Sequence, residues 1–153
     1  MKKTILFMAL FFIIYFIHGC VSQQLATKEE MTHEFILEYP SLSKDILFDR
    51  TLKWIANNFR SAKQVIEYQD KESGAIIGNG VVNITADGSI IGPFPVGFTM
   101  NIDLKDGKAR YRFLNLNHNG NPIETYAWHK PARDKFVSII NSIKIAMDVN
   151  DEF

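Results

Sequence analysis

The sequence predicts a single α+β domain, with an antiparallel sheet of about five strands and two helices packed on one face. Three observations support this prediction: apolar residues at helical spacing near each end of the domain, alternating residues between them, and turn signals that divide the alternating part into strands. The predicted order is strand, helix, four strands, helix. The chain of 153 residues is long enough for one such domain, which we expect over residues 33–150.

The domain is predicted to begin with a strand and a helix. The strand runs from Glu34 to Tyr39, with Phe35 and Leu37 on the same face as Tyr39, and Pro40 ends it. Ser41 or Ser43 can cap the following helix by accepting a hydrogen bond from its first amides. That helix is expected to reach about residue 59, because apolar residues recur at helical spacing: Phe48, Leu52, Ile55 and Phe59.

Two further strands are predicted over residues 65–69 and 75–85, joined by the loop 70–74. The pair Asp87-Gly88 marks the next turn. Residues 92–95 contain two prolines, which have no N–H to donate to a neighbouring strand. We therefore expect this segment to interrupt pairing or to lie at an edge of the sheet.

A hairpin around Asp106-Gly107 is the most detailed structural prediction. Apolar residues alternate with polar ones from Val96 to Leu104, and a two-residue turn then fixes the register of the next strand. The expected cross-strand pairs are Met100 with Phe113, Ile102 with Tyr111, and Asp103 with Arg110.

A second helix is predicted from about Pro131 to Val149. Proline suits the first helical position, where its missing N–H would have no partner. The apolar stripe of this helix consists of Phe136, Ile139, Ile140, Ile143 and Met147.

The first nineteen residues have the layout of a secretory signal peptide. Lys2 and Lys3 precede the apolar run 5–17, whose length as a helix, about 20 Å, is short of the roughly 30 Å hydrocarbon core of a bilayer. The segment Ile17-His18-Gly19-Cys20 resembles the lipobox of bacterial lipoproteins. The resemblance implies cleavage before Cys20 and attachment of a diacylglycerol to its thiol. An ordinary signal peptide with an incidental cysteine, or an uncleaved anchor, remain as alternatives.

The chain after the signal is predicted to be a lipid-attached tether over residues 20–32, because it is polar and has no apolar periodicity. Val21 is not Asp, the residue that retains lipoproteins in the inner membrane, so an outer-membrane location is favoured. Cys20 is the only cysteine, which rules out a disulfide within the chain.

The charge balance argues against nucleic acid as a partner. The chain has 17 basic and 17 acidic residues, and removing the signal peptide takes away two of the basic ones. A protein that neutralises several phosphates needs a basic face, and the sequence contains no cluster that would supply one.

Four segments are similar to a bacterial lipoprotein family described as a domain of unknown function with a fold like that of the TATA-box-binding protein (TBP). They are Asp49-Arg50 to Trp54, Ser61-Ala62-Lys63-Gln64-Val65-Ile66, Lys71-Glu72-Ser73-Gly74-Ala75-Ile76-Ile77-Gly78-Asn79-Gly80, and Phe98 to Arg112 with Asp103-Leu104-Lys105-Asp106-Gly107-Lys108. The resemblance implies a TBP-like fold but no mechanism. The name of the fold does not imply DNA binding.

Two partial motifs are better explained by structure than by chemistry. His33-Glu34 begins like the HExxH zinc motif, but Leu37 replaces the second histidine and the segment is predicted as a strand. Gly78 and Gly80 resemble the start of a dinucleotide-binding loop, but no helix follows. We expect these glycines to let a helix approach the sheet closely. We expect no cofactor, and no metal site, because the spacing of the histidines matches no ligand pattern.

Residues 115–130 are the candidate functional segment, predicted as a long connection before the last helix. Long connections in compact domains often bind ligands, and tyrosine and tryptophan are common contact residues. The candidate binding residues are His118, Glu124, Tyr126, Trp128 and His129. In the alternative interpretation, which we favour, Tyr126 and Trp128 form a short edge strand or fill the core.

The expected function is that of a non-enzymatic, lipid-anchored envelope protein that presents a sheet-and-loop surface to a protein or other ligand. No serine or cysteine lies in a nucleophile pattern, and no small-molecule ligand is indicated. The alternative is a hydrolase or isomerase acting on an envelope component, with Glu124 and either His118 or His129 as its acid–base groups.

Overall fold

The computed structural model describes residues 24–59 and 65–148, and the predicted signal peptide and Cys20 lie outside these ranges. The first elements are the short helix α2 (Lys28–Met31), the strand β1 (His33–Glu38) and the helix α3 (Lys44–Asn58). Ser43 caps α3, accepting a hydrogen bond from the Ile46 N–H. The predicted first strand and first helix are therefore present.

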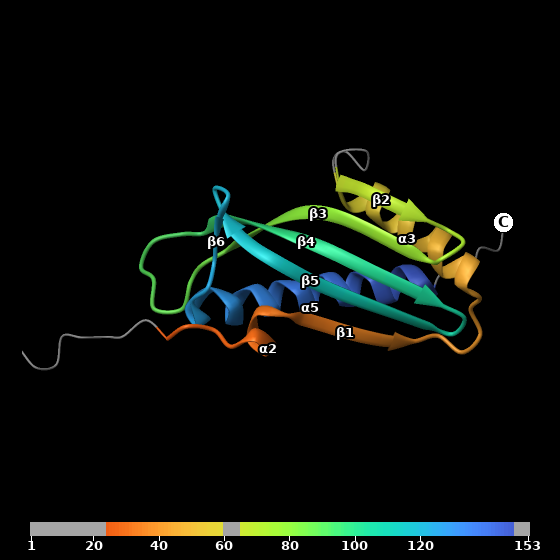
Figure 1. Cartoon of the computed structure of the whole chain (residues 1–153), viewed down its shortest axis with the longest axis horizontal. Coiled ribbons are helices and arrows are strands. Elements are labelled where there is room, and N and C mark those ends of the chain that lie inside the picture. Colours follow the sequence, from red (N-terminus) through yellow and green to blue (C-terminus); the bar gives the residue numbers. More distant parts are fainter. Residues whose placement is uncertain (1–23, 60–64, 149–153) are drawn as a thin grey trace, which may run out of the picture.

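An antiparallel sheet of six strands forms the centre of the domain (Figure 1). After β1, its strands are β2 (Ile66–Asp70), β3 (Ala75–Ile84), β4 (Phe94–Lys105), β5 (Lys108–His118) and β6 (Asn121–Pro122). The strand order is β1-β5-β4-β3-β2, and β6 pairs with the end of β5. The predicted α+β class is confirmed, with one strand more than expected.

The β4–β5 hairpin has the predicted register. Met100 pairs with Phe113, Ile102 with Tyr111, and Asp103 with Arg110. The Asp103 carboxylate forms ion pairs with Arg110 at 2.9 Å and with Arg112 at 3.0 Å. The turn fixed all three pairs because a shift of one residue would move each side chain to the opposite face.

The last helix, α5 (Tyr126–Asp148), begins five residues earlier than predicted. Pro131 lies inside the helix rather than at its first position. A proline there removes one helical hydrogen bond, the one that its N–H would donate to the carbonyl of Ala127. That carbonyl instead accepts the N–H of Asp87 at 2.9 Å, from the β3–β4 connection. The freed acceptor is therefore satisfied by another part of the chain.

Of the two alternatives predicted for residues 92–95, Pro95 follows the second: it pairs with Asn83 of β3 and lies at a local edge on its other side. Its carbonyl accepts a hydrogen bond from the His118 side chain, on the β5 side. The N–H and C=O of one strand residue point to the same side, so the missing N–H also faces β5. The β5 ladder has already ended there, at the pair of Gly97 with Asn117.

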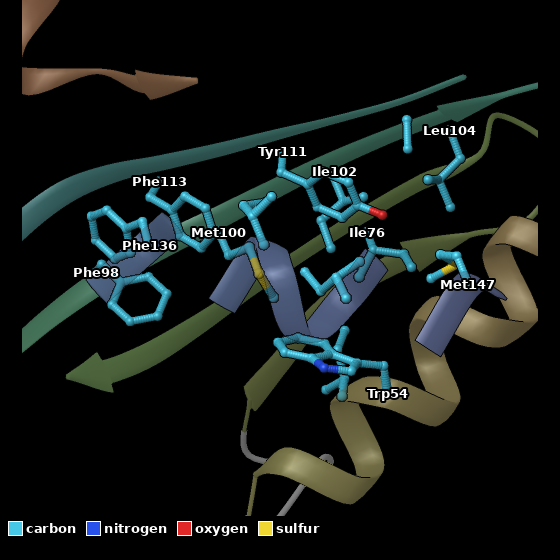
Figure 2. Packing of buried hydrophobic residues seen from close by; sticks show 14 of the residues in the cluster. Trp54, Ile76, Phe98, Met100, Ile102, Leu104, Tyr111, Phe113, Phe136 and Met147 are labelled. Carbon is cyan, nitrogen blue, oxygen red and sulfur yellow. The ribbon is translucent and has the colours of Figure 1, made fainter. Parts of the chain in front are cut away.

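The core lies between one face of the sheet and the helices α3 and α5, with Phe136 of α5 at one end (Figure 2). Its ring stacks on Phe113 of β5, with 4.3 Å between centroids and 6° between planes, and meets Phe98 of β4 at 5.2 Å. The two helices are joined where the Trp54 indole N–H donates to the Ser142 hydroxyl at 2.9 Å.

Gly78 and Gly80 do lie on the buried face of β3, but at Gly80 the close neighbour is an aromatic ring rather than the predicted helix. A Cβ at Gly80 would overlap the ring of Phe98, which lies across from it on β4. A Cβ at Gly78 would lie 2.6 Å from the carbonyl oxygen of Val65. The space left by Gly80 is therefore filled by an aromatic ring of the neighbouring strand, a common way of covering a glycine in a sheet.

Replacing Gly80 with alanine should lower the free energy of unfolding by about 1–3 kcal/mol, because the new methyl group overlaps Phe98. Combined with Phe98→Leu, the loss should be smaller than the sum of the two single losses. Urea unfolding of the four chains tests this. Val81→Ala, on the exposed face of the same strand, should change stability by less than about 0.5 kcal/mol. Strict additivity of Gly80→Ala and Phe98→Leu would contradict the assignment.

Candidate functional site

The candidate segment 115–130 was predicted to be a long loop, but it forms regular structure. Its first part completes β5, turns at Asn119-Gly120 and returns as β6, with His118 paired to Asn121. Asn119 and Gly120 have φ values of 52° and 81°, the positive values that a two-residue hairpin turn of this kind requires. The remainder, from Tyr126, is the beginning of α5.

The N-terminal part of the described chain packs beside the start of α5, although residues 20–32 were predicted as a tether. Leu25 forms an antiparallel bridge with Thr125, and the N–H of Ala26 donates to the Glu124 carbonyl at 2.7 Å. The helix α2 follows, capped by Thr27 in a capping box with Glu30. The expectation of irregular chain therefore does not hold for residues 24–32.

Two buried histidines meet beneath α2. His33 of β1 and His129 of α5 are 2% and 3% exposed, and His33 Nε2 lies 3.2 Å from His129 Nδ1. The other ring nitrogen of His129, Nε2, lies 2.9 Å from the Ile123 carbonyl, to which it donates. The network thus assigns the hydrogens: His33 Nε2–H donates to His129, and His129 Nε2–H donates to Ile123.

Burial, together with the smaller effects of the neighbouring His129 and Arg133, lowers the pKa of His33 to about 4. Its ring also packs on Phe136, with centroids 5.1 Å apart. The imidazole is therefore neutral at physiological pH and forms part of the wall of the core.

A shallow pocket of about 300 Å³ opens beside the histidine pair. It is lined by Glu29, Glu30, His33, Tyr126, His129, Lys130 and Arg133. A second pocket of about 290 Å³ lies against α2 and includes Glu124 and His129 in its lining. The two pockets share His129.

His118 and Trp128 lie elsewhere, in an aromatic cluster with Phe94 of β4. The rings of His118 and Trp128 stack with 6.0 Å between centroids, and Phe94 lies 5.7 Å from one and 5.8 Å from the other. His118 Nδ1–H donates to the Pro95 carbonyl at 2.8 Å. Trp128 is half-buried against the core, so its ring fixes the start of α5 rather than standing free for a ligand.

The five predicted binding residues therefore do not form one site. Tyr126 and His129 line one pocket, Glu124 lines the other with His129, and the remaining two belong to the aromatic cluster. His33, whose side chain hydrogen-bonds to His129, was not among the predicted binding residues. Its pairing joins residues 96 positions apart, so no local pattern could reveal it.

The imidazoles and the carboxylate named in the enzymatic alternative have other partners or surroundings in the fold. Both nitrogens of His129 are engaged in hydrogen bonds, and one nitrogen of His118 is bound to a backbone carbonyl. No hydrogen bond or ion pair among the described residues joins the Glu124 carboxylate to either imidazole. Within residues 24–59 and 65–148, no group of three or more His, Cys, Asp or Glu side chains is placed to hold a metal ion.

The second feature that can bind a partner is the sheet face opposite the two long helices. Side chains of β2, β3, β4 and β5 on this face form a polar line: the Asn79 side chain donates to Glu67 and accepts from Thr99, and Asn115 donates to Thr99. Three large apolar or aromatic side chains on the same face are strongly exposed, namely Ile36 and Tyr68 at 50% each and Val81 at 64%. We call this surface the open sheet face.

The comparisons with known proteins agree with this architecture. A family model described as "Domain of unknown function (DUF4468) with TBP-like fold" matches residues 34–119, more than half of the chain. The chain belongs to the DUF4468 family. The match begins within β1 and ends at the β5–β6 turn, so it includes α3, the strands β2 to β5 and most of β1.

Two crystal structures of distant sequence share the fold. A DUF4468 family protein from Bacteroides ovatus has a TM-score of 0.63 at 13% identity, covering 87% of this chain and 95% of that one. A TBP-like protein from Parabacteroides distasonis has a TM-score of 0.63 at 11% identity, covering 83% of this chain and 99% of that one. At such identities the similarity establishes the fold alone. No curated protein matches the chain.

The histidine pair should make the stability of this DUF4468 domain depend on pH. The pKa of His33 is about 4 in the folded state and 6.5 in the unfolded state, so the unfolded chain binds the proton first. The contribution of His33 is complete above about pH 6.5 and is lost as the pH falls toward 4, with an upper bound of about 3 kcal/mol.

We predict that His33→Gln reduces the loss of stability between pH 6.5 and pH 4.5, because the amide can still donate to His129 but does not titrate. Urea unfolding across this range measures the slope. Val82→Ala, which removes partly buried methyl groups elsewhere, should lower stability but keep the slope. Equal slopes in His33→Gln and the native chain would refute the role of His33.

Proposed function

We propose that this DUF4468 protein is a lipid-anchored, non-enzymatic protein of the cell envelope that binds a protein partner through its open sheet face. The lipid on Cys20 would hold the domain at the outer membrane. The observation that carries the binding role is the sheet face that none of the described helices covers, with its polar line across four strands beside exposed Tyr68 and Val81.

The sequence around Cys20 supports the anchor. A basic start, an apolar run too short to cross a bilayer as a helix, and Ile17-His18-Gly19-Cys20 have the order of a lipoprotein signal. None of the helices in the described part of the chain is long and apolar enough to span a membrane. Attachment through Cys20 would therefore supply the membrane contact, and two or more acyl chains make such an anchor stable.

The size of the open sheet face suits a protein partner. The strands β1 to β5 contain 44 residues, which at about 4.8 Å between strands and about 3.3 Å per residue present on the order of 700 Å². A standard protein interface uses about 800 Å² of each partner. The described pockets hold about 260–300 Å³ each and are shallow, so each offers a ligand less contact area than the open sheet face.

The chemistry of the face also suits such a partner. Its amide and hydroxyl groups are donors and acceptors, and Tyr68 is a residue type that is enriched at interfaces. Arg110 and Arg112 share one partner, Asp103, and Glu38 and Glu67 add negative charge on the same face, so the charges of this face are largely balanced. A balanced polar face favours a protein over a polyanion such as nucleic acid.

The anchor predicts a clear effect of Cys20→Ala. The native chain should fractionate with membranes and carry the mass of two or three acyl chains, whereas Cys20→Ala should appear in the soluble fraction without that mass. Intact mass and fractionation together measure this. Ser22→Ala, two residues further on, should behave like the native chain. A native protein with a free Cys20 thiol would contradict the anchor.

The binding role predicts a photo-crosslink from one face only. A benzoylphenylalanine at Val81, on the open sheet face, should give a discrete adduct in intact cells. The same group at Ile145, 69% exposed on α5, should not. Gel electrophoresis and mass spectrometry identify the adduct.

Asn79→Arg should weaken the adduct formed at position 81 by about tenfold or more, because it puts a long, positively charged side chain where the polar line has a short amide. Asn141→Arg is the matched control: the same substitution at an exposed asparagine of α5. Adducts from position 145 but not from position 81 would move the interface to the helices and contradict the proposal.

A further inference from the structure

We infer that the β3–β4 loop, residues 85–93, is a membrane contact that inserts Ile90 and Ile91 into the bilayer on which the protein is anchored. This inference rests on the lipid anchor at Cys20 proposed above. It adds a second contact with the lipid and an orientation of the domain on the membrane.

The loop exposes more apolar surface than its position between two strands requires. Ile90 is 100% exposed and Ile91 is 67% exposed, side by side at the tip. Isolated exposed apolar residues are common, but two adjacent isoleucines at a loop tip form a patch that water solvates poorly. The one charged residue of the loop is Asp87, and it forms an ion pair with Lys130 at 3.2 Å.

The body of the loop is held against the domain. The N–H of Asp87 donates to the Ala127 carbonyl, the acceptor that Pro131 leaves free within α5, and Ala86 is buried. Ser89 and Ile91 add two further hydrogen bonds, which shape the turn before the tip. The two isoleucines are therefore presented outward by a fixed base, as an inserting loop requires.

The loop lies at the end of the domain where the described chain begins. Figure 1 shows the β3–β4 loop, in green, at the same end of the sheet as the chain before α2. Backbone contacts support this placement: Leu25 and Ala26 pair with residues 124–125, and the loop bonds to Ala127, two residues further along. Leu25 is itself 66% exposed and adds to the apolar surface of this end.

The short chain between Cys20 and the domain makes the bilayer the fitting occupant. Only three residues separate Cys20 from Gln24, whose carbonyl accepts the N–H of Tyr126. The four residue steps from Cys20 to Gln24 span at most about 14 Å, so the acyl chains would hold this end of the domain close to the membrane surface. The uncharged, aliphatic tip matches the hydrocarbon region.

This placement leaves the open sheet face accessible. β4 leads away from the loop for twelve residues, to the β4–β5 turn at the other end of the sheet. The loop end would rest on the lipid, and the strands would stand away from it. A contact with lipid at the loop end and a protein partner on the face are therefore compatible.

The test uses the lipidated protein in phosphatidylcholine vesicles, with a single engineered cysteine carrying the fluorophore NBD. Cys20 does not compete for the label when its thiol carries lipid. Ile90→Cys should show blue-shifted emission that is quenched severalfold by lipids with a doxyl group in the acyl chain. Lys105→Cys, at the opposite end of β4, is the matched control and should show neither effect.

Quenching equal to that at Lys105 would overturn the membrane contact while leaving the anchor intact, provided that the protein floats with the vesicles and has the lipidated mass. A blue shift in native envelopes but no doxyl quenching in purified vesicles would assign the loop to a protein partner and also overturn it. A chain that neither carries lipid nor floats would contradict the anchor, and with it this inference.

Discussion

The packing of Phe136 is the constraint on which most of the structure depends. Its ring stacks on Phe113 of β5, meets Phe98 of β4 and touches His33 of β1, so one side chain of α5 holds three strands. β3 joins the same cluster through Gly80, which leaves room for Phe98. An aromatic group of this kind combines a large buried area with a defined geometry. It therefore sets both the height of the helix above the sheet and its rotation.

The sequence predicted the fold class and the central hairpin, because these depend on local signals. Asp106-Gly107 fixes a two-residue turn, and the register of the flanking residues follows from strand geometry. The start of α5 was predicted wrongly, because proline is more common at the first position of a helix than inside it. Pro131 is tolerated there since Asp87, distant in sequence, uses the carbonyl that it frees. Such compensation cannot be inferred from a local pattern.

The candidate site was less predictable than the fold. Two of its elements have local signals that the prediction did not use: Asn119-Gly120 indicates a hairpin, and Thr27 with Glu30 forms a capping box. The pairing of His33 with His129 had none, because it arises from packing of β1 against α5. The polar line of the open sheet face likewise depends on the register between strands, which places Asn79 beside Thr99. The residue types therefore indicated candidate binding residues, but which of them lie together depends on the fold.

The short bridge between residues 24–26 and 124–126 has a mechanical consequence. A force applied at the N-terminal end of the chain first reaches this bridge, where two backbone hydrogen bonds and one strand pair connect it to the beginning of α5. The load then passes along the helix into the core rather than into β1, whose hydrogen bonds to β5 would otherwise open one after another. The bridge thus carries the load before it reaches β1, the edge strand, and so protects the pairing of β1 with β5.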